Sequence, residues 1–180
     1  MAIITLTTDF GNKDHFVPAL KGSILKEIPD ATLVDVSHEI SPFNIQECAY
    51  VLKNAYRAFP KGTIHIVGLD SEPSPENEHI VVYANGHFFI GANNGVISLI
   101  TCDIKRKEVF EINLQNMEKT TFPTHAVFLK AACHLAKGGK PGALGKAFHG
   151  LKELKEFEPR ILGDGKSIAG NVIYLSLIHI

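Results

Sequence analysis

The chain opens with a short run of apolar and β-branched residues, AIITLTT at positions 2–8, which stops at Asp9-Phe10-Gly11. A run of this kind closed by a turn is typical of a buried strand. Apolar residues at helical spacing follow over His15–Glu27, and Asp14 is placed to cap that helix. The sequence therefore predicts a strand that leads directly into a helix.

The same unit then repeats along the chain. Strands are predicted at Ala31–Val36 and Thr63–Leu69, with a second helix between them at Ile45–Phe59. Strand–helix–strand–helix–strand with short turns is the pattern of a parallel sheet with right-handed crossovers.

Antiparallel strands are expected after this parallel part. His79–Tyr83 and His87–Gly91 flank Asn85-Gly86, which supplies the positive φ angles of a tight hairpin turn. The fold class predicted is therefore α/β, with a mixed, largely parallel central sheet flanked by helices and an antiparallel hairpin. The remaining expected elements are a strand at Val96–Thr101, a helix at Ala126–Lys137 and a final strand at Asn171–Ile180.

Composition excludes several classes of partner. The 180 residues include 18 Lys+Arg and 19 Asp+Glu, and a net charge of -1 gives no electrostatic footprint for nucleic acid or an anionic membrane. No stretch approaches the roughly 20 apolar residues of a membrane span, and the N-terminus lacks the basic region of a signal peptide. Cys48, Cys102 and Cys133 show no C-x-x-C spacing, so neither a disulfide framework nor a zinc site is expected. We expect a cytoplasmic protein with no nucleic-acid partner, no membrane partner and no metal.

Three aspartates, Asp9, Asp35 and Asp70, lie at or near the ends of the predicted parallel strands. Ligands of open α/β sheets bind beyond the carboxyl ends of the strands. Carboxylates gathered there would suit ribose hydroxyls, a metal ion or general base chemistry. The alternative is that each aspartate caps the segment after it, and Asp35, which lies within its strand, fits that role best. Dinucleotide, P-loop and hydrolase-elbow motifs do not occur.

Several motifs in register point to a known family. Together they resemble the opening of the S-adenosylmethionine (SAM) hydroxide adenosyltransferase and SAM-dependent chlorinase/fluorinase family, over about residues 3–150. The segments that carry the resemblance are Thr8-Asp9-Phe10-Gly11, Asp14-His15-Phe16-Val17, Leu20-Lys21-Gly22, Val34–Ile40, Phe59–His65 and Gly91-Ala92-Asn93-Asn94-Gly95.

The resemblance implies a SAM-binding-like α/β domain at residues 1–150, followed at 151–180 by a linker and the first strand of a C-terminal β domain. The remainder of that domain is missing, and the terminal LSLIHI (175–180) departs from the family, so we expect a truncated reading frame. The family also implies a homotrimer with active sites between subunits. Its reaction is attack of hydroxide or halide on the 5′-carbon of SAM, which is a substrate, so no separate cofactor is expected.

The resemblance also implies site residues. Asp9, with Phe10 beside it, would hold the ribose hydroxyls, and Asp70 occupies the position of the family's catalytic Asp. The Arg of the family corresponds to Asn77, and its His corresponds to Pro123, so His79 or His125 would have to supply a base or cation. The candidate catalytic residues are therefore Asp70, His79 and His125, and the candidate substrate-binding residues are Asp9, Phe10, Asn77 and Asn93.

Four functions are compatible with these residues. The leading hypothesis is a SAM hydrolase that releases adenosine and methionine. The alternative is a non-catalytic SAM- or nucleoside-binding protein, motivated by the replacements at Asn77 and Pro123. A SAM-dependent halogenase is a minor alternative, and an unrelated α/β domain is the remaining one.

Overall fold

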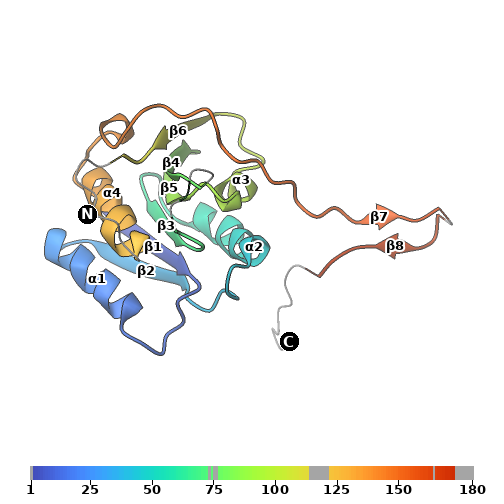
Figure 1. The fold of residues 1–180 in the computed structure, drawn as a ribbon, viewed down its shortest axis with the longest axis horizontal. Coiled ribbons are helices and arrows are strands. Elements are labelled where there is room, and N and C mark those ends of the chain that lie inside the picture. Colours follow the sequence, from blue (N-terminus) through green and yellow to red (C-terminus); the bar gives the residue numbers. More distant parts are fainter. Residues whose placement is uncertain (1, 73, 75–76, 114–121, 164, 173–180) are drawn as a thin grey trace.

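The centre of the protein is a six-stranded sheet with the order β2-β1-β3-β5-β4-β6. The computed structural model describes residues 2–72, 74, 77–113, 122–163 and 165–172 (Figure 1). The strands of the sheet are β1 (Ile3–Thr8), β2 (Thr32–Ser37), β3 (Ile64–Gly68), β4 (His79–Ala84), β5 (His87–Ala92) and β6 (Lys107–Glu111).

Pairing in the sheet is mixed and largely parallel, as the sequence predicts. Strand β1 pairs in parallel with both β2 and β3, and β3 pairs in parallel with β5. Strand β4 is antiparallel to β5 and to β6. The hairpin between β4 and β5 turns at Asn85 and Gly86, whose φ angles of 52° and 83° are the positive values that this turn needs.

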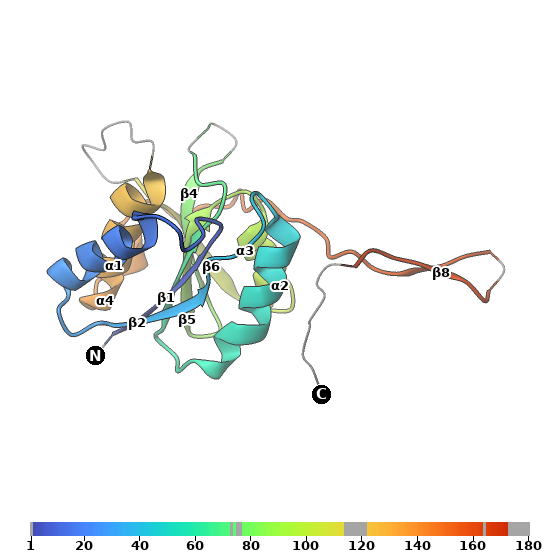
Figure 2. The same cartoon turned by 90° about the horizontal axis from the view of Figure 1, so that it is seen from below.

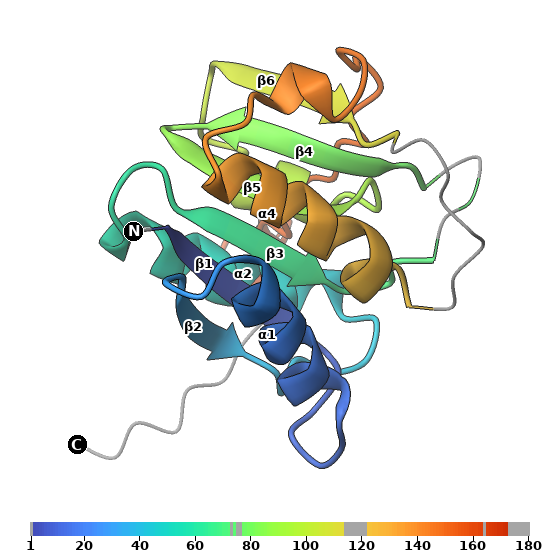
Figure 3. The same ribbon diagram turned by 90° about the vertical axis from the view of Figure 1, so that its left-hand side faces the viewer.

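Helices cover both faces of the sheet. Figure 2 shows α1 and α4 on one side of the strands and α2 and α3 on the other, and Figure 3 looks onto the α1/α4 side. The helices are α1 (Phe16–Glu27), α2 (Ile45–Ala55), α3 (Val96–Ile100) and α4 (Leu129–Ala136), with short helical turns at Tyr56–Ala58, Thr124–Phe128 and Pro141–Ala143. The Asp14 carboxylate accepts the Phe16 N–H (3.1 Å) at the start of α1, close to the predicted capping position.

The side chains of β1 point alternately to the two faces of the sheet, and each face is covered by one layer of helices. Ile4 and Leu6 are fully buried and pack with α1 and α4. Thr5 and Thr7 are equally buried, and because successive side chains of a strand point to opposite faces, they face α2. Burial of each large apolar side chain stabilises the fold by about 1.5–3 kcal/mol, so Ile4 and Leu6 hold the α1/α4 layer to this strand.

Two predicted elements differ from the structure. The prediction of a strand at Val96–Thr101 is wrong, because this segment forms α3. Asn94 accepts the Val96 N–H through Oδ1 (3.1 Å), and Gly95 has a φ of 98°, so the chain turns into a helix at this point. In so short an apolar run, the spacing of apolar residues does not distinguish a strand from a helix. Strand β6, by contrast, was not predicted.

The C-terminal part leaves the body as an arm (Figure 1). Strands β7 (Arg160–Ile161) and β8 (Ile168–Ala169) pair as an antiparallel ribbon in this arm. Most of the strand predicted at Asn171–Ile180 falls outside the described residues, and the predicted division of the chain at residue 150 stays a prediction. Within the described part of the chain, no helix has the length and apolar character needed to cross a membrane.

A pair of histidines is buried on the α2 side of the sheet. His65 Nδ1 lies 2.7 Å from Thr5 Oγ1, and its Nε2 lies 3.1 Å from His87 Nδ1. Tyr56 and Phe89 pack on both rings. Burial, with a smaller repulsion from His87, lowers the pKa of His65 from 6.5 to about 3.

We predict that acid destabilises the protein through His65. The unfolded chain binds a proton near pH 6.5 and the folded protein only near pH 3, so this stability is complete above pH 6.5 and is lost as the pH falls toward 3. Between about pH 7.5 and about pH 5 the loss is about 2 kcal/mol. Urea unfolding measures the free energy of unfolding at both pH values. The loss between them should be about 2 kcal/mol smaller in His65→Leu than in wild type or in the control His149→Gln, which changes an exposed histidine. Equal pH dependence in all three proteins would contradict the prediction.

Candidate functional site

The predicted aspartates Asp9 and Asp70 lie at the same edge of the sheet. Thr8, the last residue of β1, pairs in register with Gly68, the last residue of β3. Asp9 and Asp70 follow directly in the two loops. The chain leaves β1 toward β2 on one side, while β3 lies on the other side, so this is the point of the sheet where strand order reverses. Open α/β sheets bind ligands at such a point.

The Asp9 carboxylate is held by the loop that follows β2. Its Oδ2 accepts the N–H of Phe43 at 3.2 Å. Phe43 has a φ of 60°, unusual for a bulky residue, and 71% of its side chain is exposed. The Gly11 N–H donates to the His38 carbonyl (2.8 Å), which joins the same two loops a second time. Asp9 therefore sits on a fixed turn, with an exposed aromatic ring on the neighbouring loop.

Asp70 is exposed and has a backbone φ of 43°, in the left-handed region. Its loop is closed by Asn77, whose Nδ2 donates to the carbonyls of Asp70 (3.2 Å) and Glu72 (3.1 Å). The amide of Asn77 thus shapes the loop that presents Asp70. Its predicted contact with substrate stays a prediction.

An apolar wall lies beside Asp9 on the α1/α4 side. The Phe10 ring contacts Phe122 edge-on at 5.3 Å and Phe16 at 6.2 Å between centroids. A Cβ at Gly68 would lie 3.1 Å from Phe10 Cζ and 3.0 Å from Thr124 Cγ2. Because Gly68 has no side chain, Phe10 can cover the end of β3. The structure therefore brings predicted residue Phe10 next to the strand that leads to Asp70.

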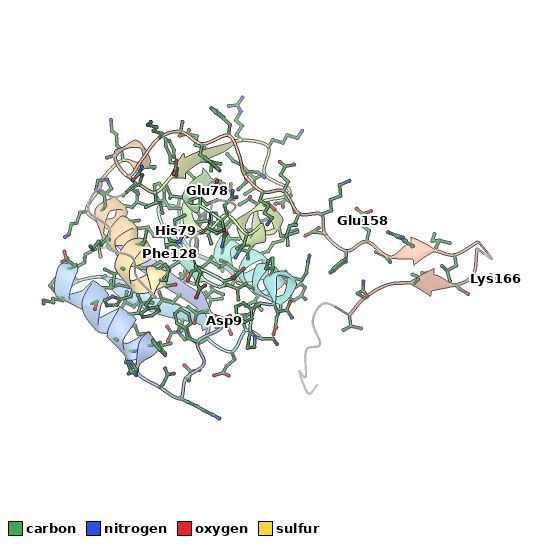
Figure 4. All side chains as sticks on the ribbon, viewed as in Figure 1. Asp9, Glu78, His79, Phe128, Glu158 and Lys166 are labelled. Carbon is green, nitrogen blue, oxygen red and sulfur yellow. The ribbon has the colours of Figure 1, made fainter. Side chains whose placement is uncertain are left out.

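The two candidate histidines lie in different surroundings. His79 is buried, with its Nε2 2.9 Å from the Ser71 carbonyl and its ring 4.9 Å from that of Phe128 (Figure 4). Burial lowers the pKa of His79 despite the opposing hydrogen bond, so the ring is neutral and Nε2–H donates to Ser71. His125 is half-buried, and its Nε2 lies 2.8 Å from Ser23 Oγ of α1. His79 thus supports the residue next to Asp70, and His125 binds α1. Their catalytic roles stay predictions.

Asn93 is tied to the segment that follows residue 149. It is 3% exposed, and its Nδ2 donates to Glu78 Oε2 and to the Gly150 carbonyl, both at 3.0 Å. Its Oδ1 accepts the Lys152 N–H at 2.8 Å. These bonds hold the start of the C-terminal segment against the end of β5. The predicted substrate contact of Asn93 is not tested by them.

The sequence analysis missed two parts of this edge. Phe43 could have been suspected only as the aromatic of a strand-end loop. Thr8 ends β1 and His38 follows β2, so the 2.7 Å contact between their Oγ1 and Nδ1 atoms has no local signal in the sequence. In the part of the chain that the structure describes, no three His, Cys, Asp or Glu residues are grouped as metal ligands.

Comparison with known proteins decides the family. A family model described as the SAM hydroxide adenosyltransferase N-terminal domain matches residues 4–145. The chain belongs to this family. The resemblance found in the sequence motifs is therefore confirmed. Thr124, in the matched region, lies against the Asp70 loop, since its Oγ1 is 3.2 Å from Ser71 Oγ.

Relatives include enzymes of two kinds. An (R)-S-adenosyl-L-methionine hydrolase of Methanocaldococcus jannaschii is 39% identical over 116 residues, which cover 62% of this chain and 44% of that protein. A fluorinase of Actinopolyspora mzabensis is 23% identical over 163 residues, covering 76% of this chain and 54% of the fluorinase.

A solved structure has the same fold. An uncharacterized conserved protein of Thermotoga maritima superposes with a TM-score of 0.80 at 28% identity, covering 90% of this chain and 64% of that one. The chain thus spans less than two thirds of the length of each of these three proteins.

We predict that the left-handed backbone at Asp70 makes substitutions there unequal in stability. Asn tolerates positive φ about as well as Asp, so Asp70→Asn should change the free energy of unfolding by less than about 0.5 kcal/mol. Ala does not, and Asp70→Ala should cost about 1 kcal/mol. Urea denaturation of the two variants measures this difference. Equal stability of both would mean that the loop relaxes at no cost.

Proposed function

We propose that the protein hydrolyses SAM to adenosine and methionine. The observation that carries the proposal is the placement of Asp9 and Asp70 after adjacent parallel strands, at the reversal of strand order, in a chain of this family. A nucleoside at this edge would have one carboxylate for its ribose and a second for the reacting water.

The reaction needs little covalent chemistry from the protein. The sulfonium of SAM is already a good leaving group, so the enzyme has to align water with the C5′–S bond and exclude other water. In the proposed step an electron pair of water forms the O–C5′ bond, and the C5′–S bond breaks with its pair left on the sulfur of methionine. The released proton passes to the Asp70 carboxylate, which acts as general base.

Asp9 is the proposed ribose ligand. A carboxylate can accept from both ribose hydroxyls, and the Phe43 N–H already fixes the orientation of this one at 3.2 Å. The exposed Phe43 ring and the Phe10 wall offer apolar surfaces for the nucleoside near Asp9. We further infer, from the family alone, that copies assemble as a homotrimer.

The alternative of a non-catalytic SAM-binding protein rests on Asn77. A neutral amide occupies the position of the family's Arg, and it is engaged with loop carbonyls at 3.2 and 3.1 Å. Halogenation remains a minor alternative, because fluorinases are among the relatives.

We predict that incubation of the complete gene product with SAM yields adenosine, measured by chromatography against a no-enzyme control. Asp70→Asn removes the base and should lower kcat by about 100-fold or more with little change in KM. Asp9→Asn removes a charged hydrogen-bond acceptor and should mainly raise KM, by about tenfold or more.

Other products separate the alternatives. A 5′-halogenated nucleoside formed only in the presence of chloride or fluoride indicates a halogenase. Calorimetric SAM binding without any product indicates the binding protein. If folded protein neither binds nor converts SAM, all three hypotheses are wrong.

A further inference from the structure

A row of polar side chains lies beneath the turn that carries Asp9. Lys21 of α1 pairs with Asp35 of β2, and Asp35 Oδ1 lies 3.0 Å from Nε2 of His38. The other ring nitrogen of His38, Nδ1, lies 2.7 Å from Oγ1 of Thr8, the residue before Asp9. Thr8 is fully buried and His38 is 4% exposed. The row therefore connects the Lys21–Asp35 ion pair to Thr8, the residue that directly precedes Asp9.

The charge on Asp35 determines which ring nitrogen of His38 carries a proton. Burial raises the pKa of Asp35, but the hydrogen bond from Lys21 and the nearby His38 ring outweigh this effect and leave the pKa below its usual value. The carboxylate is therefore ionised at neutral pH. His38 Nε2 lies 3.0 Å from the Asp35 carboxylate without the alignment of a hydrogen bond, and a proton on this nitrogen is favoured because the carboxylate would repel a lone pair at this distance.

The tautomer of His38 then decides what the Thr8 hydroxyl does. In a neutral imidazole protonated on Nε2, Nδ1 is an acceptor, so the Thr8 hydroxyl donates its proton to it. The lone pairs of Thr8 Oγ1 are left to accept the Phe10 N–H, which points at this oxygen from 3.4 Å. With the other tautomer, Nδ1–H would donate to Oγ1, and the buried Thr8 hydroxyl proton would lose Nδ1 as its acceptor.

His38 thus contacts the Asp9 turn at two points. The first is Thr8, whose Oγ1 accepts the Phe10 N–H, and the second is the Gly11 N–H, which donates to the His38 carbonyl at 2.8 Å. Asp9 lies between Thr8 and Phe10, inside the first contact. A change in the direction of the His38–Thr8 hydrogen bond would reorient the Thr8 hydroxyl and leave the second contact unchanged.

We propose that Asp35 fixes His38 as the Nε2-protonated tautomer and that His38, through the Thr8 hydroxyl, positions the Asp9 turn for ribose. Asp35, His38 and Thr8 are positioning residues. Their link to ribose rests on the proposed function, whereas the tautomer and the turn can be measured without any substrate.

The first test is NMR of the substrate-free protein with ¹⁵N-labelled histidine rings, in which His38→Gln assigns the His38 signals. We expect the Nε2–H tautomer in wild type and its loss or mixing in Asp35→Ala. Lys21→Met, which removes the outer cation but leaves the carboxylate, is the matched control and should keep the tautomer. An Nδ1–H tautomer in wild type, or no change in Asp35→Ala, would overturn the proposal.

The second test follows the turn. Thr8→Val has nearly the same shape but no hydroxyl, and Thr8→Ser keeps the hydroxyl. Hydrogen exchange of the Phe10 amide should accelerate about tenfold or more in Thr8→Val and remain near wild type in Thr8→Ser. If the row only fills space, Thr8→Val would exchange like wild type, and the proposal would be wrong.

Calorimetry with SAM connects the turn to binding. The SAM dissociation constant should rise about tenfold in Thr8→Val and stay within about threefold of wild type in Thr8→Ser. If wild type binds no SAM but the NMR and exchange results are as expected, the proposed function is wrong. The proposed tautomer of His38 and its contact with the Asp9 turn then still hold. If SAM binds equally to all variants, the positioning role fails and the proposed function stands.

Discussion

The parallel pairing of β1 with β2 on one side and β3 on the other is the constraint from which the rest of the site follows. It sets Thr8 beside Gly68, and this register carries Asp9 and Asp70 to one edge of the sheet. It also sets the end of β1 next to β2, so that Thr8 meets His38. A slip of one residue in either ladder would turn these side chains to the opposite face and separate the groups.

The loops around this edge are held by the protein's own polar groups. Phe43 donates to Asp9, Asn77 donates to the Asp70 carbonyl, and His79 donates to Ser71. Organisation of this kind before substrate arrives is what a displacement at carbon requires, since alignment and exclusion of water do most of the work. In this chain Asn77 and His79 serve the geometry of the loop that presents the Asp70 carboxylate.

The sequence predicts this edge because its signals are local. A β-branched run followed by Asp9, and a second one followed by Asp70, announce strand ends, and parallel strands place such ends together. The segment at Val96 was misjudged because a short, mostly apolar run fits a buried strand as well as a helix, and the turn made by Asn94 and Gly95 directs it into a helix. The Thr8–His38 contact joins residues 30 positions apart, so only the folded sheet reveals it.

A crystal structure of the complete gene product with adenosine and methionine tests the central claim most directly. If Asp9 and Asp70 form one site, both ribose hydroxyls will lie within hydrogen-bond distance of the Asp9 carboxylate, and Asp70 will face C5′ on the side opposite the methionine sulfur. A nucleoside bound elsewhere, or one whose ribose has no contact with Asp9, would contradict it.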